Sequence, residues 1–463
     1  MSYTTENKSN IAIIPVTKNT LVDALNTYPN TVSSWVKSSG FKAKPDEFCL
    51  VPDKSGNIEK VLVGVAEKIQ SDTGIAMWAI STLPKKLPLG QYHLECDWND
   101  LLKLQAAIGW GLGAYSFDFF KQDFLEQTQK PLLKVADAQL KQINAYVDAF
   151  TLVRDLINTP ANHMMPEHMA ELTNELAMQH KASFEEIVGE NLLNENFPAI
   201  HAVGRASAHE PRLLKLMWGD ESHPLLSLVG KGVCFDTGGL DLKPSKFMRN
   251  MKKDMGGAAH VLGLAHMIMS LNLPVRLQVL IPAVDNAISS DAYRPGDIIE
   301  TRAHKTVEID NTDAEGRVVL CDALTLACES SPDLIIDFAT LTGAARVAVG
   351  TEIPALFTNS DSLLTGLQNA SKISGELLWP LPLHHAYRYQ LDSTVADIAN
   401  SSPEGYGGAI TAALYLNEFV DENIQWAHLD MMAFNTRDRP GRPKGGEAMG
   451  LLAVFEYLQQ RYN

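Results

Sequence analysis

The sequence has few cysteines, and none of them form a closely spaced pair. Five occur in 463 residues, an odd number, and no two stand in a Cys-x-x-Cys arrangement. They are Cys49, Cys96, Cys234, Cys321 and Cys328. A disulfide framework needs paired cysteines, and a zinc ribbon needs closely spaced ones. The sequence therefore indicates neither.

Long apolar runs and a basic surface are also missing. No run of about 18 uncharged apolar residues occurs, so we expect no membrane span. The first ten residues are polar and include an acid, unlike a signal peptide, so we expect a cytoplasmic protein. The formal net charge is -16. Because phosphate binding needs clustered lysine and arginine, we expect no nucleic-acid partner.

The pattern along the chain predicts α/β architecture in two domains. Residues 1–137 alternate short strands, as at 11–16 and 60–66, with helices such as 100–121. Residues 138–165 contain a continuous helical pattern and are expected to link the domains. In residues 166–463, four apolar runs alternate with helical stretches, which predicts a sheet covered on both faces. The runs are 225–229, 275–281, 334–338 and 425–430, and the helical stretches are 256–270, 316–329, 363–373 and 408–420.

The stretch Asn-Thr-Asp-Ala-Glu-Gly-Arg at 311–317 is the first candidate site. It lies between a predicted strand, 306–309, and a predicted helix, 318–328. If the stretch is extended, Asp313, Glu315 and Arg317 alternate and point the same way. Carboxylates that close together need a cation, and a metal ion is the simplest one. The alternative is a surface turn with a local salt bridge.

A second charged group follows the apolar run at 225–229. Lys231 interrupts an apolar segment that Asp236 ends, and a lone buried lysine is costly unless it is paired or neutral. A neutral amine offers a lone pair to a metal. The alternative is a structural Lys231–Asp236 ion pair. Asp254 precedes an apolar helix, where an aspartate is an ordinary N-cap. We expect Lys252 and Lys253 to be solvated.

Together these residues predict a centre for metal-assisted hydrolysis. Four carboxylates and one amine suit two divalent ions, which can share and activate a water molecule. Lys243 and Arg317 remain as cations for developing negative charge. The thirteen histidines form no His-Glu-x-x-His pattern, and His260 and His266 are interpreted as packing or surface residues. The spacing leaves open whether the target is an amide or a phosphate ester.

Several segments resemble the leucyl aminopeptidase family, the M17 cytosol aminopeptidases. Residues 311–317 match the family signature at every position. The resemblance is strong from about residue 154 to 457 and weak before that, apart from 111–121. The further matching segments are 229–239, 243–245, 253–259, 293–297 and 340–344.

The resemblance implies a role for each site residue. One metal ion would be held by Lys231, Asp236, Asp254 and Glu315, and a more exchangeable one by Asp236, Asp313 and Glu315. Lys243 would polarise the scissile carbonyl, and Arg317 would hold a bicarbonate that helps to move a proton. The main-chain carbonyl of Leu341 would hold the substrate. The residues that would line its side-chain pocket are Met248, Thr340 and Gly343.

The resemblance also implies the architecture and the partners. The fold would be a smaller N-terminal α/β domain and a C-terminal catalytic domain with a mixed central sheet flanked by helices. The ions would be Mn²⁺ or Zn²⁺, the substrates peptides with a free N-terminal amine, and the assembly a homohexamer. Two alternatives are a non-catalytic structural relative and a dinuclear phosphohydrolase. The intact set of ligands argues against the first, and lysine as a ligand against the second.

Overall fold

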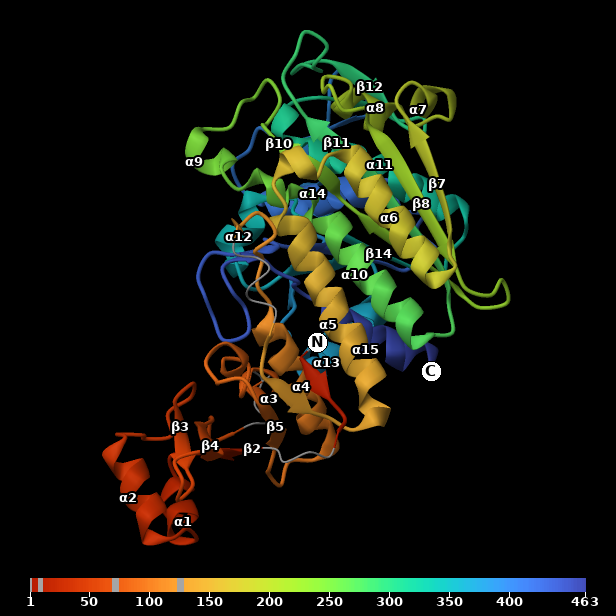
Figure 1. Cartoon of the computed structure of the whole chain (residues 1–463). Coiled ribbons are helices and arrows are strands. Elements are labelled where there is room, and N and C mark those ends of the chain that lie inside the picture. The colour runs from red at the N-terminus through yellow and green to blue at the C-terminus, as the bar shows by residue number, and fades with distance from the viewer. Residues whose placement is uncertain (1, 7–10, 69–74, 123–128) are drawn as a thin grey trace. The chain divides into compact units, whose positions relative to one another are not determined.

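The computed structural model describes residues 2–6, 11–68, 75–122 and 129–463, and the chain forms two compact units (Figure 1). Unit 1 runs to Thr151 and includes the later segment Arg437–Lys444. Unit 2 comprises Leu152–Thr436 and Gly445–Asn463. The helix α5 (Asp137–Asn158) contains the point at which the first unit gives way to the second.

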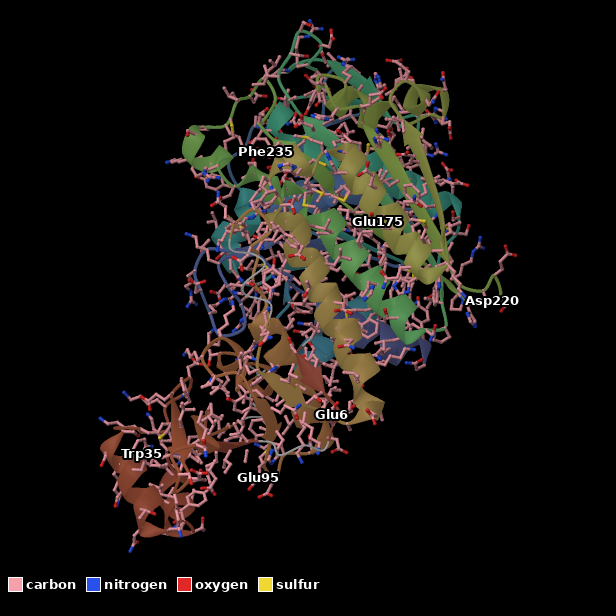
Figure 2. All side chains as sticks on the ribbon, viewed as in Figure 1. Glu6, Trp35, Glu95, Glu175, Asp220 and Phe235 are labelled. Carbon is pink, nitrogen blue, oxygen red and sulfur yellow. The ribbon has the colours of Figure 1, made fainter. Side chains whose placement is uncertain are left out.

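Unit 1 is built on a six-stranded sheet of order β1-β6-β5-β2-β4-β3. Its pairs are parallel except β3 with β4. Trp35, which is labelled in Figure 2, lies in α2. About half of it is exposed. The elements are β1 Tyr3–Thr4, β2 Ile11–Val16, α1 Leu21–Asn26, α2 Asn30–Ser38, β3 Phe48–Pro52, β4 Ile58–Gly64, α3 Ile75–Trp78, β5 Gln91–Leu94, α4 Asp100–Ala114 and β6 Leu132–Lys134.

Unit 2 contains a mixed sheet of order β16-β15-β18-β14-β9-β11-β8-β7, in which β10 also pairs with β11. Strands β18, β14, β9 and β11 run parallel, whereas β8 is antiparallel to β11. The strands are β7 Ser183–Val188, β8 Arg212–Trp218, β9 Leu225–Gly230, β10 Gly232–Asp236, β11 Arg276–Asn286, β14 Leu334–Ala339, β15 Ala355–Thr358, β16 Trp379–Pro380 and β18 Trp426–Asp430. Smaller sheets join β12 Ile298–Glu300, β13 Thr306–Glu308 and β17 Ile398–Ala399, and β19 Phe434–Asn435 with β20 Gly445–Gly446.

Helices cover both faces of this sheet. Val229 of β9 lies in the buried cluster with Val318 and Leu320 of α11. Its neighbour Gly230 faces the other way, since a Cβ there would meet Val261 of α10. The helices are α6 Pro166–His180, α7 Asn191–Asn194, α8 Pro198–Gly204, α9 Ser245–Met248, α10 Gly256–Leu271, α11 Glu315–Glu329, α12 Gly343–Val349, α13 Asp361–Ser374, α14 Gly408–Asn417 and α15 Leu451–Tyr462.

The predicted fold class, α/β with a mixed sheet flanked by helices, is confirmed. One predicted helix is too long: the stretch 100–121 forms α4 only as far as Ala114. Tyr115 has an extended backbone, and Lys130 donates to the carbonyl of Ala114, which ends the helix. Serine and aromatic residues follow there, and they favour helices less than the preceding residues do. No described helix is long and apolar enough to cross a bilayer.

Candidate metal centre

The site lies at the carboxyl ends of adjacent parallel strands. Lys231 follows β9 directly, Asp236 ends β10, and Thr340 follows β14. Strand β9 pairs in parallel with β14 and with β11, and β11 pairs in parallel with β10. The ends of these strands therefore share one edge of the sheet, as the sequence predicted for its ligands.

Helix α10 begins directly against this edge. The amide of Lys231 donates to the carbonyl of Phe338 (3.0 Å), and the amide of Ala258 donates to the carbonyl of Lys231 (2.8 Å). A Cβ at Gly257 would lie 2.0 Å from that Phe338 oxygen, so only glycine permits the approach. The 3₁₀ turn η4 (Met251–Met255) precedes the helix and carries Asp254 to the strand ends.

One half of the site is centred on the ammonium of Lys231. Its Nζ lies 2.5 Å from Asp254 Oδ2 and 2.8 Å from Glu315 Oε1, and it donates to the carbonyl of Thr340 at 3.2 Å. All three charged side chains are almost fully buried. Lys231 thus pairs with Asp254 and Glu315, and the alternative interpretation of a Lys231–Asp236 ion pair is wrong. Asp254 is not the N-cap of α10 either, since Met255 holds that position.

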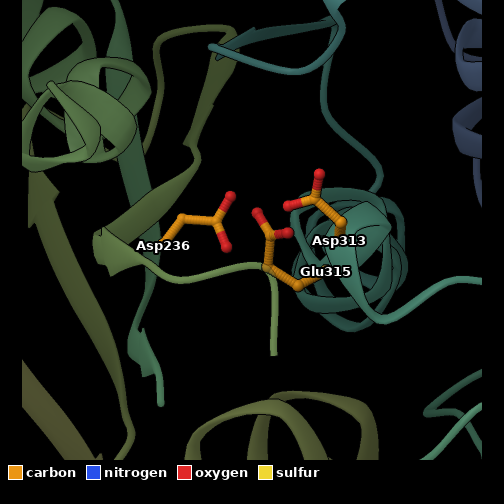
Figure 3. A group of neighbouring side chains, drawn as sticks. All are labelled: Asp236, Asp313 and Glu315. Atoms are coloured by element: carbon orange, nitrogen blue, oxygen red, sulfur yellow. The ribbon is translucent and has the colours of Figure 1, made fainter. Parts of the chain in front are cut away.

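Three carboxylates form the other half. Asp236, Asp313 and Glu315 each offer an oxygen, and these atoms lie within 4.8 Å of one another. Figure 3 shows the three groups directed toward a shared space, with Glu315 at the end of a helix. The side chain of Asp313 is about one-third exposed, whereas the other two are buried. The ammonium of Lys243 pairs with Asp236 Oδ2 at 2.7 Å and with Asp313.

The pKa shifts of the acids indicate that the carboxylates in this space carry more negative charge than the neighbouring lysines balance. Burial and the charge of Asp236 raise the pKa of Glu315 to about 8, although Lys231 opposes the shift. Burial and the same aspartate raise the pKa of Asp313 to about 6. Burial would also raise the pKa of Asp254, but Lys231 outweighs it and holds that pKa below its usual range. The lysine charge thus stabilises Asp254 and leaves Glu315 and Asp313 short of positive charge.

The residues fit a divalent metal ion. Glu315 Oε2 is buried and has no hydrogen-bond partner among the described residues, although such atoms are normally satisfied. Carboxylate oxygens are hard ligands, and an uncharged lysine adds a nitrogen. A cation among Asp236, Asp313 and Glu315 would relieve their mutual repulsion.

The turn that carries Asp313 differs from the prediction. Thr312–Ala314 form the 3₁₀ turn η5, and Glu315 is the first residue of α11. The expectation that Asp313, Glu315 and Arg317 alternate on an extended segment is therefore wrong. Asp313 and Glu315 still converge, but buried Arg317 donates through Nη1 to the carbonyl of Asn400 at 2.8 Å. Burial lowers the pKa of that guanidinium.

The predicted substrate residues lie mostly on the loop after β14. Thr340 donates through Oγ1 to Asp254 Oδ1 at 2.8 Å, which places it beside the Lys231 half of the site. The amide of Leu341 donates to Asp430 Oδ1 at 2.9 Å. Gly343 is exposed and opens α12, and half-buried Met248 ends α9. Their contribution to a side-chain pocket stays a prediction.

The sequence does not predict the places of several residues around the site. Lys253 was expected to be solvated but is only 3% exposed, because η4 turns it inward beside Asp254. Asp430 ends a buried strand as Asp236 does, and that shared position was an available signal. Asn400 accepts through Oδ1 from the amides of Asp310 and Asn311.

The sequence matches two models of one protein family and several curated proteins. Residues 151–455 match the model of the cytosol aminopeptidase family, catalytic domain, and residues 11–132 match that of the M17 aminopeptidase N-terminal domain. A probable cytosol aminopeptidase of Syntrophotalea carbinolica is 40% identical over 82% of this chain and 78% of its own. One of Aquifex aeolicus is 35% identical over 91% and 88%.

Solved structures agree with these matches. The crystal structure of cytosol aminopeptidase from Coxiella burnetii has a TM-score of 0.95 and 48% identity, with all of both chains covered. The bottromycin maturation enzyme BotP in complex with Mn has a TM-score of 0.88 and 32% identity, over 98% of this chain and 100% of its own.

Proposed function

Since the chain belongs to the cytosol aminopeptidase family, we propose that it releases N-terminal amino acids from peptides by means of two divalent metal ions. The family makes the protein a peptidase of the hydrolase class. The observation that carries the two-metal proposal is the convergence of Asp236, Asp313 and Glu315 beside the buried group of Lys231 and Asp254.

The two halves of the site would hold one ion each, with two ligands in common. Lys231 and Asp254 would belong to the buried ion, and Asp313 to the other. Asp236 and Glu315 would serve both. The partial exposure of Asp313 supports an exchangeable second ion, because solvent can reach that ligand. When bound, the ions supply Lewis-acid chemistry, activating a water molecule and polarising the scissile carbonyl.

Lys243 and Arg317 would act on the substrate and on the proton. The ammonium of Lys243 pairs with Asp236 and Asp313, so it is charged and lies at the carboxylate group. From there it would stabilise negative charge on the carbonyl oxygen as it develops. Arg317 is buried and anchored through Nη1 on Asn400, while its Nε has no hydrogen-bond partner among the residues described. That donor supports a bound bicarbonate.

The substrate would be a peptide with a free N-terminal amine and an apolar first side chain, leucine or similar, accepted broadly. The loop after β14 supports this role, because Asp430 fixes its amides beside Thr340, which in turn bonds to Asp254. Asp430 Oδ1 accepts from Leu341 N, and Oδ2 from Thr342 N and Thr342 Oγ1. The carbonyl of Leu341 would hold the substrate, and Met248, Thr340 and Gly343 would line its pocket.

The metal, assembly and location follow by analogy with relatives. The Mn in the related enzyme BotP supports Mn²⁺ as an occupant, and Zn²⁺ shares the ligand chemistry. We propose a homohexamer in the cytoplasm, without nucleic-acid or membrane partners. The net charge of -16 supports the exclusion of nucleic acid.

Metal analysis and kinetics on one purified sample test the proposal. Protein loaded with Mn²⁺ or Zn²⁺ should contain two equivalents and hydrolyse leucine anilide. The N-acetylated anilide is the matched control and should not react, because its amine is blocked. A crystal soaked with an amino-acid hydroxamate should show two anomalous peaks. The proposal would be contradicted by a single bound ion or by a histidine within about 2.3 Å of an ion. Equal turnover of the blocked anilide would contradict it as well.

A further inference from the structure

Asn286 lies at the end of β11, directly beside Asp236. The two residues are paired across the parallel strands β10 and β11, and the asparagine is completely buried. Its Nδ2 donates to Asp236 Oδ1 at 2.8 Å and to the carbonyl of Thr312 at 3.2 Å. One amide group therefore connects the Asp236 strand end with the turn that carries Asp313.

The orientation of this amide is determined by its neighbours. Asp236 Oδ1 and the Thr312 carbonyl are both acceptors, so the opposite orientation would set an oxygen against two oxygens. The NH₂ group must face them. The price is that Asn286 Oδ1 is buried without a hydrogen-bond partner among the described residues. An unsatisfied buried acceptor is unfavourable, so the two bonds on the other side must offset it.

The bond from Asn286 selects one oxygen of Asp236. Oδ1 accepts from Asn286 Nδ2 and also from the amide of Gly238, each at 2.8 Å. Two donors use both lone pairs of that oxygen in the carboxylate plane. Oδ2 is the remaining oxygen, and it is the one that faces Lys243 at 2.7 Å. In this structure Oδ2 is therefore the oxygen of Asp236 that pairs with a cation.

We propose that Asn286 is a positioning residue that commits Asp236 to bind metal through Oδ2 alone and keeps it in register with the Asp313 turn. This rests on the proposed two-metal function, in which Asp236 serves both ions. Partners that orient a ligand commonly change metal affinity by about 10- to 100-fold when they are removed. Loss of Asn286 should weaken the binding of both ions, because both would bind to Asp236 Oδ2.

Chelator competition against Mn²⁺ and Zn²⁺, with metal analysis after dialysis, tests this on the full chain. Asn286→Leu removes both hydrogen bonds and should weaken metal binding about 10- to 100-fold. Asn286→Asp, measured at pH 8, keeps the side-chain volume but replaces the donor with an oxygen. It should lose metal at least as strongly as Asn286→Leu, because the new oxygen faces Asp236 Oδ1 and the Thr312 carbonyl.

Two matched variants separate positioning from general damage. Gln278, elsewhere on β11, accepts from Ser227 Oγ of β9 and donates to Ser330 Oγ, and Gln278→Leu removes both bonds. Tyr293→Phe removes the other donor to the Thr312 carbonyl, a 2.7 Å bond, without touching Asp236. Gln278→Leu should bind metal as the unaltered protein does, and Tyr293→Phe should lose less metal affinity than Asn286→Leu, because it leaves the bond to Asp236 in place.

Three results would overturn the inference: tight metal binding by Asn286→Leu, tight binding by Asn286→Asp, or an equal loss in Gln278→Leu. If the unaltered protein takes up no metal, the proposed function fails as well. If it takes up two equivalents and Asn286→Leu retains them, only the role of Asn286 is wrong.

Discussion

The Nζ of Lys231 lies 2.8 Å from Oε1 of Glu315, and the Glu315 carboxylate also belongs to the group with Asp236 and Asp313. Glu315 therefore connects the two halves of the site. Asp254, which pairs with the same ammonium, lies outside that three-carboxylate group. The proposed ions would thus share Glu315 while Asp254 serves only one of them.

Glu315→Ala should abolish turnover and strip both ions. The change removes a ligand from each proposed ion, so each would face the other with less negative charge between them. Metal analysis after dialysis measures the loss. Asp322 lies further along the same helix, away from these ligands, and accepts from the amides of Ala199 and Arg302. Asp322→Ala is therefore a useful comparison. Retention of two equivalents and near-normal turnover in Glu315→Ala would contradict the shared-ligand role.

Gly316→Ala should disturb the Lys231 half of the site specifically. A Cβ at position 316 would lie 2.5 Å from Lys231 Cε and 2.7 Å from its Nζ. The lysine is fully buried, so it has little room to yield, and its ammonium must move away from Glu315. We expect one equivalent of metal to be lost while the helix remains, since alanine favours helices. Two retained equivalents with unchanged affinity would show that the chain absorbs the methyl group.

The sequence predicted features that depend on local pattern. The strand predicted at 11–16 has the observed bounds, because a short apolar run is a local signal. The carboxylates could be predicted to lie together because each follows a strand or opens a helix at one edge. Their assignment to individual metal ions came from the family resemblance.

Features that depend on the pairing of distant segments could not be predicted. Asn286 matters because β10 and β11 pair so that it lies beside Asp236, a register that no residue near 286 encodes. Lys253 was expected to be solvated, yet it is buried. Its burial depends on η4 packing against β10, a contact between segments that are not adjacent in the chain.

His260 by itself should make unit 2 less stable as the pH falls below 6.5. Burial lowers the pKa of this histidine to about 4. Its Nδ1 bonds to the carbonyl of Gly256, so Nε2 accepts from the amide of Met449 and carries no proton. Between pH 6.5 and 4 the unfolded chain binds a proton that the folded chain does not. This histidine therefore contributes about 3 kcal/mol above pH 6.5 that is lost as the pH falls toward 4.

Urea unfolding at several pH values measures that contribution. His260→Gln should be less stable at pH 7, since it loses hydrogen bonds, but its stability should depend less on pH below 6.5. His223→Gln changes an exposed histidine and should keep the slope of the unaltered protein. Equal slopes for His260→Gln and the unaltered protein would contradict the neutral buried state of His260.

The proposed hexamer should persist on dilution. The sequence predicts that unit 1 diverges from the family, but residues 11–132 match the family's N-terminal domain, so both units have counterparts in relatives. Light scattering across a tenfold range of concentration should give a mass near six times 50.8 kDa. A monomeric mass throughout that range would reject the hexamer without affecting the metal site.

The two lysines of the site should respond differently to replacement by alanine. Lys243 pairs with Asp236 and Asp313 and would stabilise developing negative charge, which needs its positive charge but no bond to metal. Lys243→Ala should keep both ions, change substrate binding modestly, and lower kcat by about two to three powers of ten, the scale of one lost oxyanion donor. Lys231 would instead give up a proton to ligate one ion. Lys231→Ala should bind that ion weakly, so excess Mn²⁺ or Zn²⁺ should restore part of the activity.

Steady-state kinetics on an amino-acid anilide, with and without added metal, separate these roles. Rescue of Lys231→Ala alone would support the assignment. Excess metal can offset weaker metal binding by mass action, but it cannot restore the positive charge of Lys243 beside the substrate. Rescue of Lys243→Ala alone would mean that the roles are reversed. Unchanged rates in both variants would place the active site elsewhere in the chain.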